Sequence, residues 1–247
     1  MKTIPYLLLL FVILISSVGN AQQSSGGIQK VPTICEPYIS MGYWNAPSHL
    51  NGYLAAVLDY FGAKGVPITA QTTFAKTFCI DGGILISRLN TVQVGLSLSY
   101  RYTPASAEYK GDMGTLNIDG SLNAADIALV VRARVARFGD YPLYFTFEPG
   151  VSYTEAEIME HLRSATMWPN YANLRWGAYD WGVRLRATLG TSFPLGPFNA
   201  GVQVGYQVNF TTVTNAEADQ GWVISHSDET GLDQDAVIFL VRVGYVF

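Results

Sequence analysis

Apolar and polar residues alternate with a period of two along most of the chain after Thr91. In the stretch 92–100 every even-numbered position is apolar, and every odd-numbered position is small or polar. Comparable alternation returns in five further stretches, at 127–136, 143–148, 181–190, 202–209 and 237–247. A period of two is typical of β-strands with one apolar face. The pattern therefore predicts an all-β protein.

The connections between these strands are alternately short and long. Short turns are expected near 88–90, 139–141 and 194–197. Long polar segments are expected at 103–123, 155–178 and 211–234. A soluble sandwich also alternates, but it has no reason to sort its connections, whereas transmembrane barrels have short periplasmic turns and longer extracellular loops. We therefore predict a transmembrane antiparallel up-and-down β-barrel of eight strands, with ten strands as the alternative.

The first third of the barrel is less regular. Strands are expected at 38–44 and at about 70–88, which completes the count of eight. Between them, apolar residues recur at helical spacing after Ser48 and before Gly62, which predicts one short amphipathic helix near 49–61. A strand is the alternative there, because apolar residues also alternate at Leu54, Ala56, Leu58 and Tyr60.

The N-terminal segment 1–21 is predicted to be a signal peptide that is removed. Lys2 supplies a positive charge, Tyr6–Ile15 form an apolar core too short to span a bilayer, and small residues follow up to Ala21. The remaining chain is expected to consist of a flexible N-terminal segment and an outer-membrane barrel domain, at 22–34 and 35–247.

Composition agrees with a membrane barrel. Hydrophobic residues make up 49% of the 247 residues and charged residues only 14%, against about 25% charged in soluble domains. No run of about 18 apolar residues follows the N-terminus, which argues against membrane-spanning helices. The net charge of −4 argues against nucleic acid as a partner. The expected partners are outer-membrane lipids and lipopolysaccharide.

Aromatic residues fall at both ends of the expected strands, on the apolar face. Such rings form girdles at the two membrane interfaces. The predicted girdle residues are Phe193 and Phe198 beside the short turns, and Tyr100, Tyr102, Tyr153, Trp181 and Phe210 beside the long loops.

The polar face carries charges that would point into the lumen. We expect a lumen charge cluster of Arg132, Arg134, Glu148, Arg184, Arg186 and Arg242, with lesser counter-charges at Asp81, Asp126 and Glu36. Counting back through the turn at Gly139 places Arg132 opposite Glu148. Because an eight-stranded barrel is just wide enough for side chains to fill it, the cluster is interpreted as a packed electrostatic core. A narrow anion-favouring pore is the alternative.

The C-terminal tail resembles the assembly signal of bacterial outer-membrane barrels. It alternates apolar residues and ends on an aromatic residue, with the signal positions at Phe239, Val241, Val243, Tyr245 and Phe247. Together with the patterns of 122–137 and 145–153, it resembles the small eight-stranded outer membrane protein β-barrel domain family. This resemblance implies an outer-membrane location, and the barrel assembly machinery as a partner during biogenesis. It implies little about activity.

Catalytic and metal chemistry have weak support. His49, His161 and His226 all fall in expected loops without metal-ligand spacing, and Ser225 and Ser227 beside His226 do not by themselves make a triad. We expect no catalytic residues, no metal and no cofactor. Whether Cys35 and Cys79 pair stays open at this point.

Two functions are compared. The first is a structural or loop-mediated interaction role for a small barrel with a packed, Arg-rich lumen. An extracellular loop partner would then contact aromatic residues of the long loops, at 167–171 and at Trp176. The alternative is a narrow pore or small-solute transport protein.

Overall fold

The computed structural model describes residues 34–45, 51, 55, 59, 62–63, 70–72, 76–89, 91–111, 114–163, 174–211, 215–218, 232 and 235–247. The expected signal peptide and the segment 22–33 lie outside these residues. Within the described part of the chain, no helix is long and apolar enough to cross a membrane.

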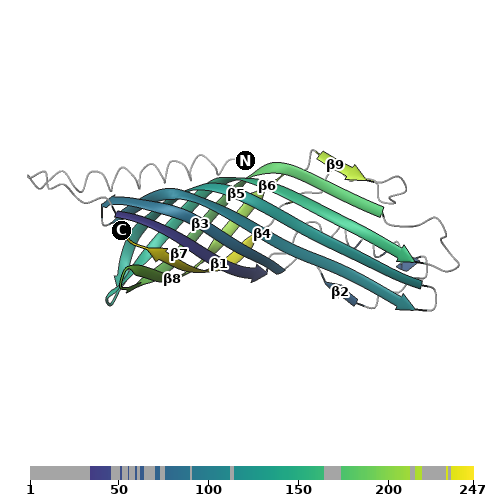
Figure 1. Ribbon diagram of the computed structural model, residues 1–247, viewed down its shortest axis with the longest axis horizontal. Coiled ribbons are helices and arrows are strands. Elements are labelled where there is room, and N and C mark those ends of the chain that lie inside the picture. Colours follow the sequence, from purple (N-terminus) through teal and green to yellow (C-terminus); the bar gives the residue numbers. More distant parts are fainter. Residues whose placement is uncertain are drawn as a thin grey trace, which may run out of the picture. The chain divides into compact units, whose positions relative to one another are not determined.

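Eight antiparallel strands form a closed ring (Figure 1). In the order of the ring they are β4, β3, β1, β10, β8, β7, β6 and β5, and pairing between β4 and β5 closes it. The strands are β1 (Ile34–Asn45), β3 (Lys76–Leu89), β4 (Val92–Gly111), β5 (Gly114–Phe138), β6 (Tyr141–Arg163), β7 (Leu174–Leu195), β8 (Phe198–Phe210) and β10 (Ala236–Tyr245). The predicted eight-stranded barrel is confirmed.

The alternation in the sequence becomes an outside and an inside. On β10 every second side chain is buried, and those between them are exposed. Exposed positions carry large apolar residues such as Val237, Phe239 and Val241, whereas many lumen positions on the other strands carry polar and charged residues. This is the reverse of a soluble barrel, and it fits an apolar solvent outside the ring.

Tight turns set the register at one end of the ring. Gly139 and Gly196 have φ angles of 60° and 65°, a left-handed conformation that glycine adopts without steric cost. They place Phe138 opposite Tyr141 and Leu195 opposite Phe198. These connections and the one between β3 and β4 lie where the short turns were predicted, and short turns mark the periplasmic end.

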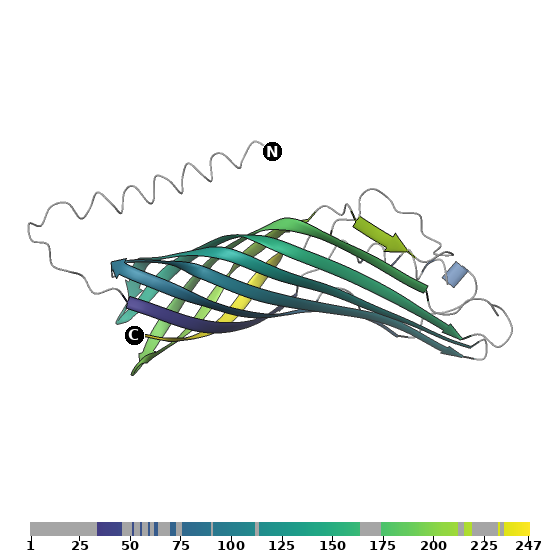
Figure 2. The same cartoon turned by 45° about the horizontal axis from the view of Figure 1, so that its top comes forward.

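At the other end, β4–β7 project beyond the ring (Figures 1 and 2). These four strands have 20 to 25 residues, against 10 to 14 for the other four. Two short strands flank the projection: β2 (Ala70–Thr72) pairs with β4, and β9 (Asn215–Ala218) pairs with β7. Among the described residues, the projection is therefore a six-stranded sheet.

The projection corrects the prediction that 103–123 and much of 155–178 are loops. Strands β4 and β5 remain paired to Gly111 and Gly114, because Leu116, Ile118 and other apolar residues alternate with polar ones in this segment. The polar residues that suggested a loop occupy one face of a sheet. The strand expected at 70–88 is likewise divided between β2 and β3.

The predicted helix near 49–61 is not found as a complete element in the described residues. Of that segment only Asn51, Ala55 and Asp59 are described, and each has a helical backbone conformation.

Candidate functional site

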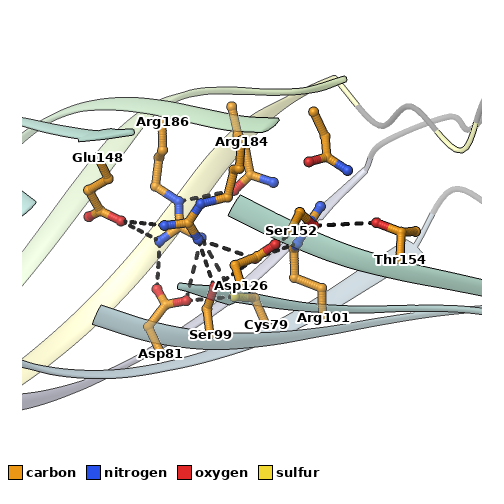
Figure 3. A network of polar contacts seen from close by, with 12 residues as sticks. Cys79, Asp81, Ser99, Arg101, Asp126, Glu148, Ser152, Thr154, Arg184 and Arg186 are labelled. Carbon is orange, nitrogen blue, oxygen red and sulfur yellow. Dashed lines mark hydrogen bonds and ion pairs between the residues drawn. The ribbon is translucent and has the colours of Figure 1, made fainter. Parts of the chain in front are cut away.

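Six charged side chains from five strands meet inside the ring (Figure 3). Three are arginines and three are carboxylates, so their formal charges cancel. None of them is more than 5% exposed. This central layer consists of Asp81 on β3, Arg101 on β4, Asp126 on β5, Glu148 on β6, and Arg184 and Arg186 on β7.

Arg186 reaches across the lumen from β7. Its Nη1 donates to Asp81 Oδ2 at 2.7 Å and lies 3.3 Å from Glu148 Oε2, while its Nε donates to Gln207 Oε1 at 3.0 Å. Asp81 also accepts from Ser40 Oγ at 3.1 Å. One guanidinium therefore joins groups on β3, β6, β7 and β8.

Asp126 is the second centre of the layer. Arg101 donates to its carboxylate from Nη2 at 2.9 Å and from Nε at 3.1 Å, and Ser99 Oγ donates to it at 2.7 Å. Arg184 bridges the two centres, because its Nη1 lies 3.3 Å from Asp126 Oδ2 and its Nη2 lies 3.0 Å from Glu148 Oε2. The six charges form one connected network.

A second charged layer lies nearer the short turns. Arg242 Nη2 donates to Glu36 Oε1 at 3.1 Å, and Arg132 Nη1 lies 3.8 Å from the same oxygen. Each guanidinium also lies over an aromatic ring: Arg132 over Tyr144 at 3.8 Å and Arg242 over Tyr38 at 3.6 Å. The face of such a ring attracts a cation. We call Glu36, Arg132 and Arg242 the periplasmic layer.

The structure separates the predicted charge cluster into these two layers. Glu148, Arg184 and Arg186 belong to the central layer, and Arg132 and Arg242 to the periplasmic one. Arg134 joins neither, since it is half-buried and makes no ion pair with the described residues. The lesser candidates Asp81, Asp126 and Glu36 all lie in ion pairs.

The expected position of Arg132 opposite Glu148 is wrong. Arg132 pairs in register with Thr146, and Glu148 contacts Arg184 and Arg186 instead. The turn places Phe138 opposite Tyr141, and an irregularity between Arg134 and Ala136 then shifts the register once more. A bulge of this kind inserts one extra residue on one strand, which a count along the sequence does not detect.

Sequence reasoning missed Arg101, although a signal was present. The sequence predicts Tyr100 and Tyr102 on the lipid face, so strict alternation requires Arg101 to point inward. The structure buries it almost completely, and both tyrosines are exposed on the outer face.

The two cysteines are both free. Cys79 lies opposite Gly42 on β1, seven residues along that strand from Cys35, and seven residues of strand span about 23 Å. A disulfide requires Cα atoms less than about 7 Å apart. Cys79 instead donates a hydrogen bond to Asp81 at 3.0 Å.

Aromatic residues form two bands on the outer face. Beside the short turns, Phe193 packs edge-on against Tyr141, and Phe198 against Tyr245. At the opposite end Tyr153 contacts Trp181, and further exposed rings lie at Tyr100, Tyr102 and Phe210. Trp181 and Phe193 are twelve residues apart on β7, which is about 40 Å along a strand and about 30 Å along the normal at usual tilts. This matches a bilayer's apolar thickness.

The residues of the expected C-terminal assembly signal line the outer face of the last strand. Phe239, Val241, Val243, Tyr245 and Phe247 are all exposed. The backbone continues the sheet past β10, because the Phe247 amide donates to the Cys35 carbonyl at 3.0 Å. Recognition of this strand by an assembly machinery stays a prediction.

Beyond the ring, the inner face of the projection is apolar. Leu116, Ile118, Ile158 and Trp176 are each no more than 1% exposed. Trp176 therefore does not offer the exposed recognition surface expected of it, and residues 167–171 lie outside the described part of the chain. Glu160 also lies on this inner face and is 6% exposed, and burial raises its pKa to about 7.

The described residues hold no group of three or more potential ligands for a metal ion. His161 lies on β6 rather than in a loop, and His49 and His226 fall outside the described residues.

No family model and no curated protein matches the chain. Among solved structures it is similar to the attachment invasion protein Ail of Yersinia pestis, at 10% identity and a TM-score of 0.37 over 86% of this chain and 99% of that one. It is also similar to a major outer membrane protein of Thermus thermophilus, at 12% identity and a TM-score of 0.41 over 86% of this chain and 99% of that one. A third similar structure is OprG of Pseudomonas aeruginosa, at 13% identity and a TM-score of 0.38 over 87% of this chain and 95% of that one. At these scores the fold assignment rests on the strand register of the chain itself.

The ring closure, the apolar outer face between two aromatic bands and the polar interior define an integral outer-membrane β-barrel. Closure pairs the strand edges, which is what allows a sheet to cross a bilayer. The expected fold class and the outer-membrane location are confirmed at this level.

Proposed function

We propose that this protein is a closed, non-conducting barrel without enzymatic activity, whose structural or interaction role depends on the projecting part of β4–β7. One observation carries the proposal. Nine charged side chains lie in two layers inside the ring, and none is more than 5% exposed.

The layers connect every strand of the ring. The central layer and its hydrogen-bond partners involve β1 and β3–β8, through Ser40 on β1 and Gln207 on β8. The periplasmic layer adds β10 through Arg242. An ion crossing this lumen would have to separate buried pairs, and each group left unpaired in a low dielectric costs several kcal/mol.

Planar-bilayer recording tests the closed lumen. The purified protein should give no steady current. The paired substitution Asp81→Ala with Arg186→Ala should introduce measurable conductance, because it removes the contact that crosses from β7 to β3. Steady current through the unsubstituted protein would favour the narrow-pore alternative and contradict the proposal.

The projection is the proposed interaction element, directed at an extracellular partner or at lipopolysaccharide. Its strands extend well past the aromatic band that contains Tyr153 and Trp181. Its outer face exposes the acidic residues Glu108, Asp119 and Glu155. A sheet of this length is more than ring closure requires, since a tilted strand of 9 to 11 residues spans a bilayer.

A shortened chain tests whether the projection serves function rather than folding. Short turns would replace Ser106–Asp119 and Glu157–Gly177, which end at register pairs of β4–β5 and β6–β7. We expect the shortened barrel to insert into the membrane and to keep its heat-modifiable migration on gels. Loss of assembly would instead make the projection part of the folding unit and contradict the proposal.

A further inference from the structure

The periplasmic layer carries more positive than negative charge. Glu36 is the single carboxylate there, and its Oε1 serves both Arg132 and Arg242. The other oxygen of Glu36 accepts from Gln93 Nε2 at 3.3 Å, and Gln93 Oε1 accepts from Arg132 Nη1 at 3.3 Å. The three charged groups leave a formal charge of +1, whereas the central layer sums to zero.

Among the described residues, both arginines also keep a donor without a partner. The Nε atoms of Arg132 and Arg242 are buried and make no hydrogen bond there, a feature that Arg184 Nε of the central layer shares, so the net charge is what distinguishes the periplasmic layer. Both residues are more than nine-tenths buried, at 3% and 4% exposed. A buried donor that stays unpaired costs about 1–3 kcal/mol, and more when it is charged.

Among the described residues, Glu36 is the one carboxylate in ion-pair contact with Arg132 or Arg242. Asp140, which lies at this end of the barrel, is exposed in the turn between β5 and β6. The segment 22–33, which precedes β1, contains no acidic residue. Gly201 lies directly opposite Arg242 on β8 and puts no side chain into the lumen beside it.

We propose that the periplasmic layer binds a small monovalent anion of chloride's chemistry, held by the guanidinium groups of Arg132 and Arg242. The formal charge of +1 matches one monovalent anion. The close packing of Tyr38 and Tyr144 against the two guanidiniums favours a compact ion over a large one. The site strengthens the closed barrel of the proposed function, but it does not depend on the role of the projection.

Thermal unfolding of the purified full chain in detergent tests the site. Sodium chloride replaces sodium gluconate at constant ionic strength, so that general screening stays the same and only the compact anion changes. An anion that binds only the folded state raises Tm with the logarithm of its concentration, by about 3–5 °C per tenfold increase above half-saturation. The unsubstituted protein should show this rise.

Two substitutions should abolish the chloride response by different means. Arg132→Gln removes one positive charge, and Gln93→Glu adds the missing negative charge beside Arg132. Arg134→Gln is the matched control, because Arg134 is the next inward position on the same strand but lies outside the layer. It should keep the response.

Equal Tm values in chloride and gluconate for the unsubstituted protein would overturn the proposal. Equal loss of the response in Arg134→Gln would also overturn it, because a general attraction of anions to the positive charges at this end of the barrel would then explain the effect. Bromide anomalous scattering from crystals of the protein provides a direct check, with a peak expected beside the guanidinium groups of Arg132 and Arg242. The experiment does not measure conductance, so it can fail while the closed-barrel proposal stands.

Discussion

Arg186 and Asp81 meet inside the barrel at 2.7 Å, although 105 positions separate them in the sequence. They come from β7 and β3, which are not neighbours in the ring. Backbone pairing joins each strand only to its neighbours, so contacts of this kind add cross-links through the interior.

Replacing Glu148 by alanine should weaken this interior. The substitution leaves Arg184 and Arg186 without a shared counter-charge, and removing one partner of a buried pair costs about 3–5 kcal/mol. We expect a lower urea midpoint for the loss of heat-modifiable migration. Glu155→Ala, on the exposed face of the same strand, should change the midpoint little. Equal midpoints for the two variants would show that the pairs contribute no stability.

A methyl group at position 244 should disturb the periplasmic layer. A Cβ built on Gly244 would lie 2.6 Å from Glu36 Oε1, closer than such atoms approach in proteins. Glu36 would have to move away from Arg242, and overpacking of this kind costs about 1–3 kcal/mol. Gly244→Ala should therefore lower the urea midpoint.

Gly82 offers the matched control for this substitution. A Cβ there meets nothing closer than the Tyr38 carbonyl at 3.9 Å, and Gly82→Ala should leave the midpoint nearly unchanged. A stable Gly244→Ala barrel with an unchanged midpoint would mean that the position of Glu36 is not fixed by packing.

The projection should loosen as the pH rises toward neutrality. Glu160 lies outside the membrane-spanning segment, seven residues or about 23 Å beyond Tyr153. The inward positions nearest to it on β5 and β7, such as Ile118 and Trp176, carry no charge. Burial raises the pKa of Glu160 from 4.5 to about 7, so the folded state holds the proton more tightly than the unfolded state.

The sign of the pH effect follows from this difference. The stabilisation is fully present below about pH 4.5 and is lost as the pH rises to about 7, where the loss levels off at no more than about 3 kcal/mol. The fluorescence of Trp176 reports it, in a chain with phenylalanine at Trp44, Trp168, Trp181 and Trp222. Glu160→Gln should remove the transition, and Glu155→Gln should retain it. A transition that persists in Glu160→Gln belongs to another group.

Cysteine labelling should locate the projection outside the cell. In a Cys35→Ser background, Glu155→Cys should react with a membrane-impermeant maleimide in intact cells, because Glu155 is exposed on the projection. Asp140→Cys, in the exposed turn at the other end, should react only after the outer membrane is permeabilised. Cys79 is fully buried and should not react in the folded barrel. The reverse pattern for the two new cysteines would invert the orientation.

The sequence by itself determined the membrane-spanning parts of most strands and the lipid-facing side, and it favoured eight strands over ten. These follow from local alternation between residues that contact lipid and residues that face the lumen, as in Val237 to Phe247. The short turns at Gly139 and Gly196 are local too, and their positions follow from where the alternation stops. The inward direction of Arg184 and Arg186 needed no more than the parity of their positions.

Only the tertiary structure decided which charges meet. The contact of Arg186 with Asp81 depends on ring closure. The displacement of Arg132 from Glu148 depends on the exact turn register and on an irregularity near Arg134 that leaves no mark in the hydrophobic pattern. The projecting strands were hidden for a related reason, since Leu116 and Ile118 are buried within a segment whose polar residues suggested a loop. Pairing across a closed barrel joins residues far apart in the chain, whereas alternation reports only on the nearest positions.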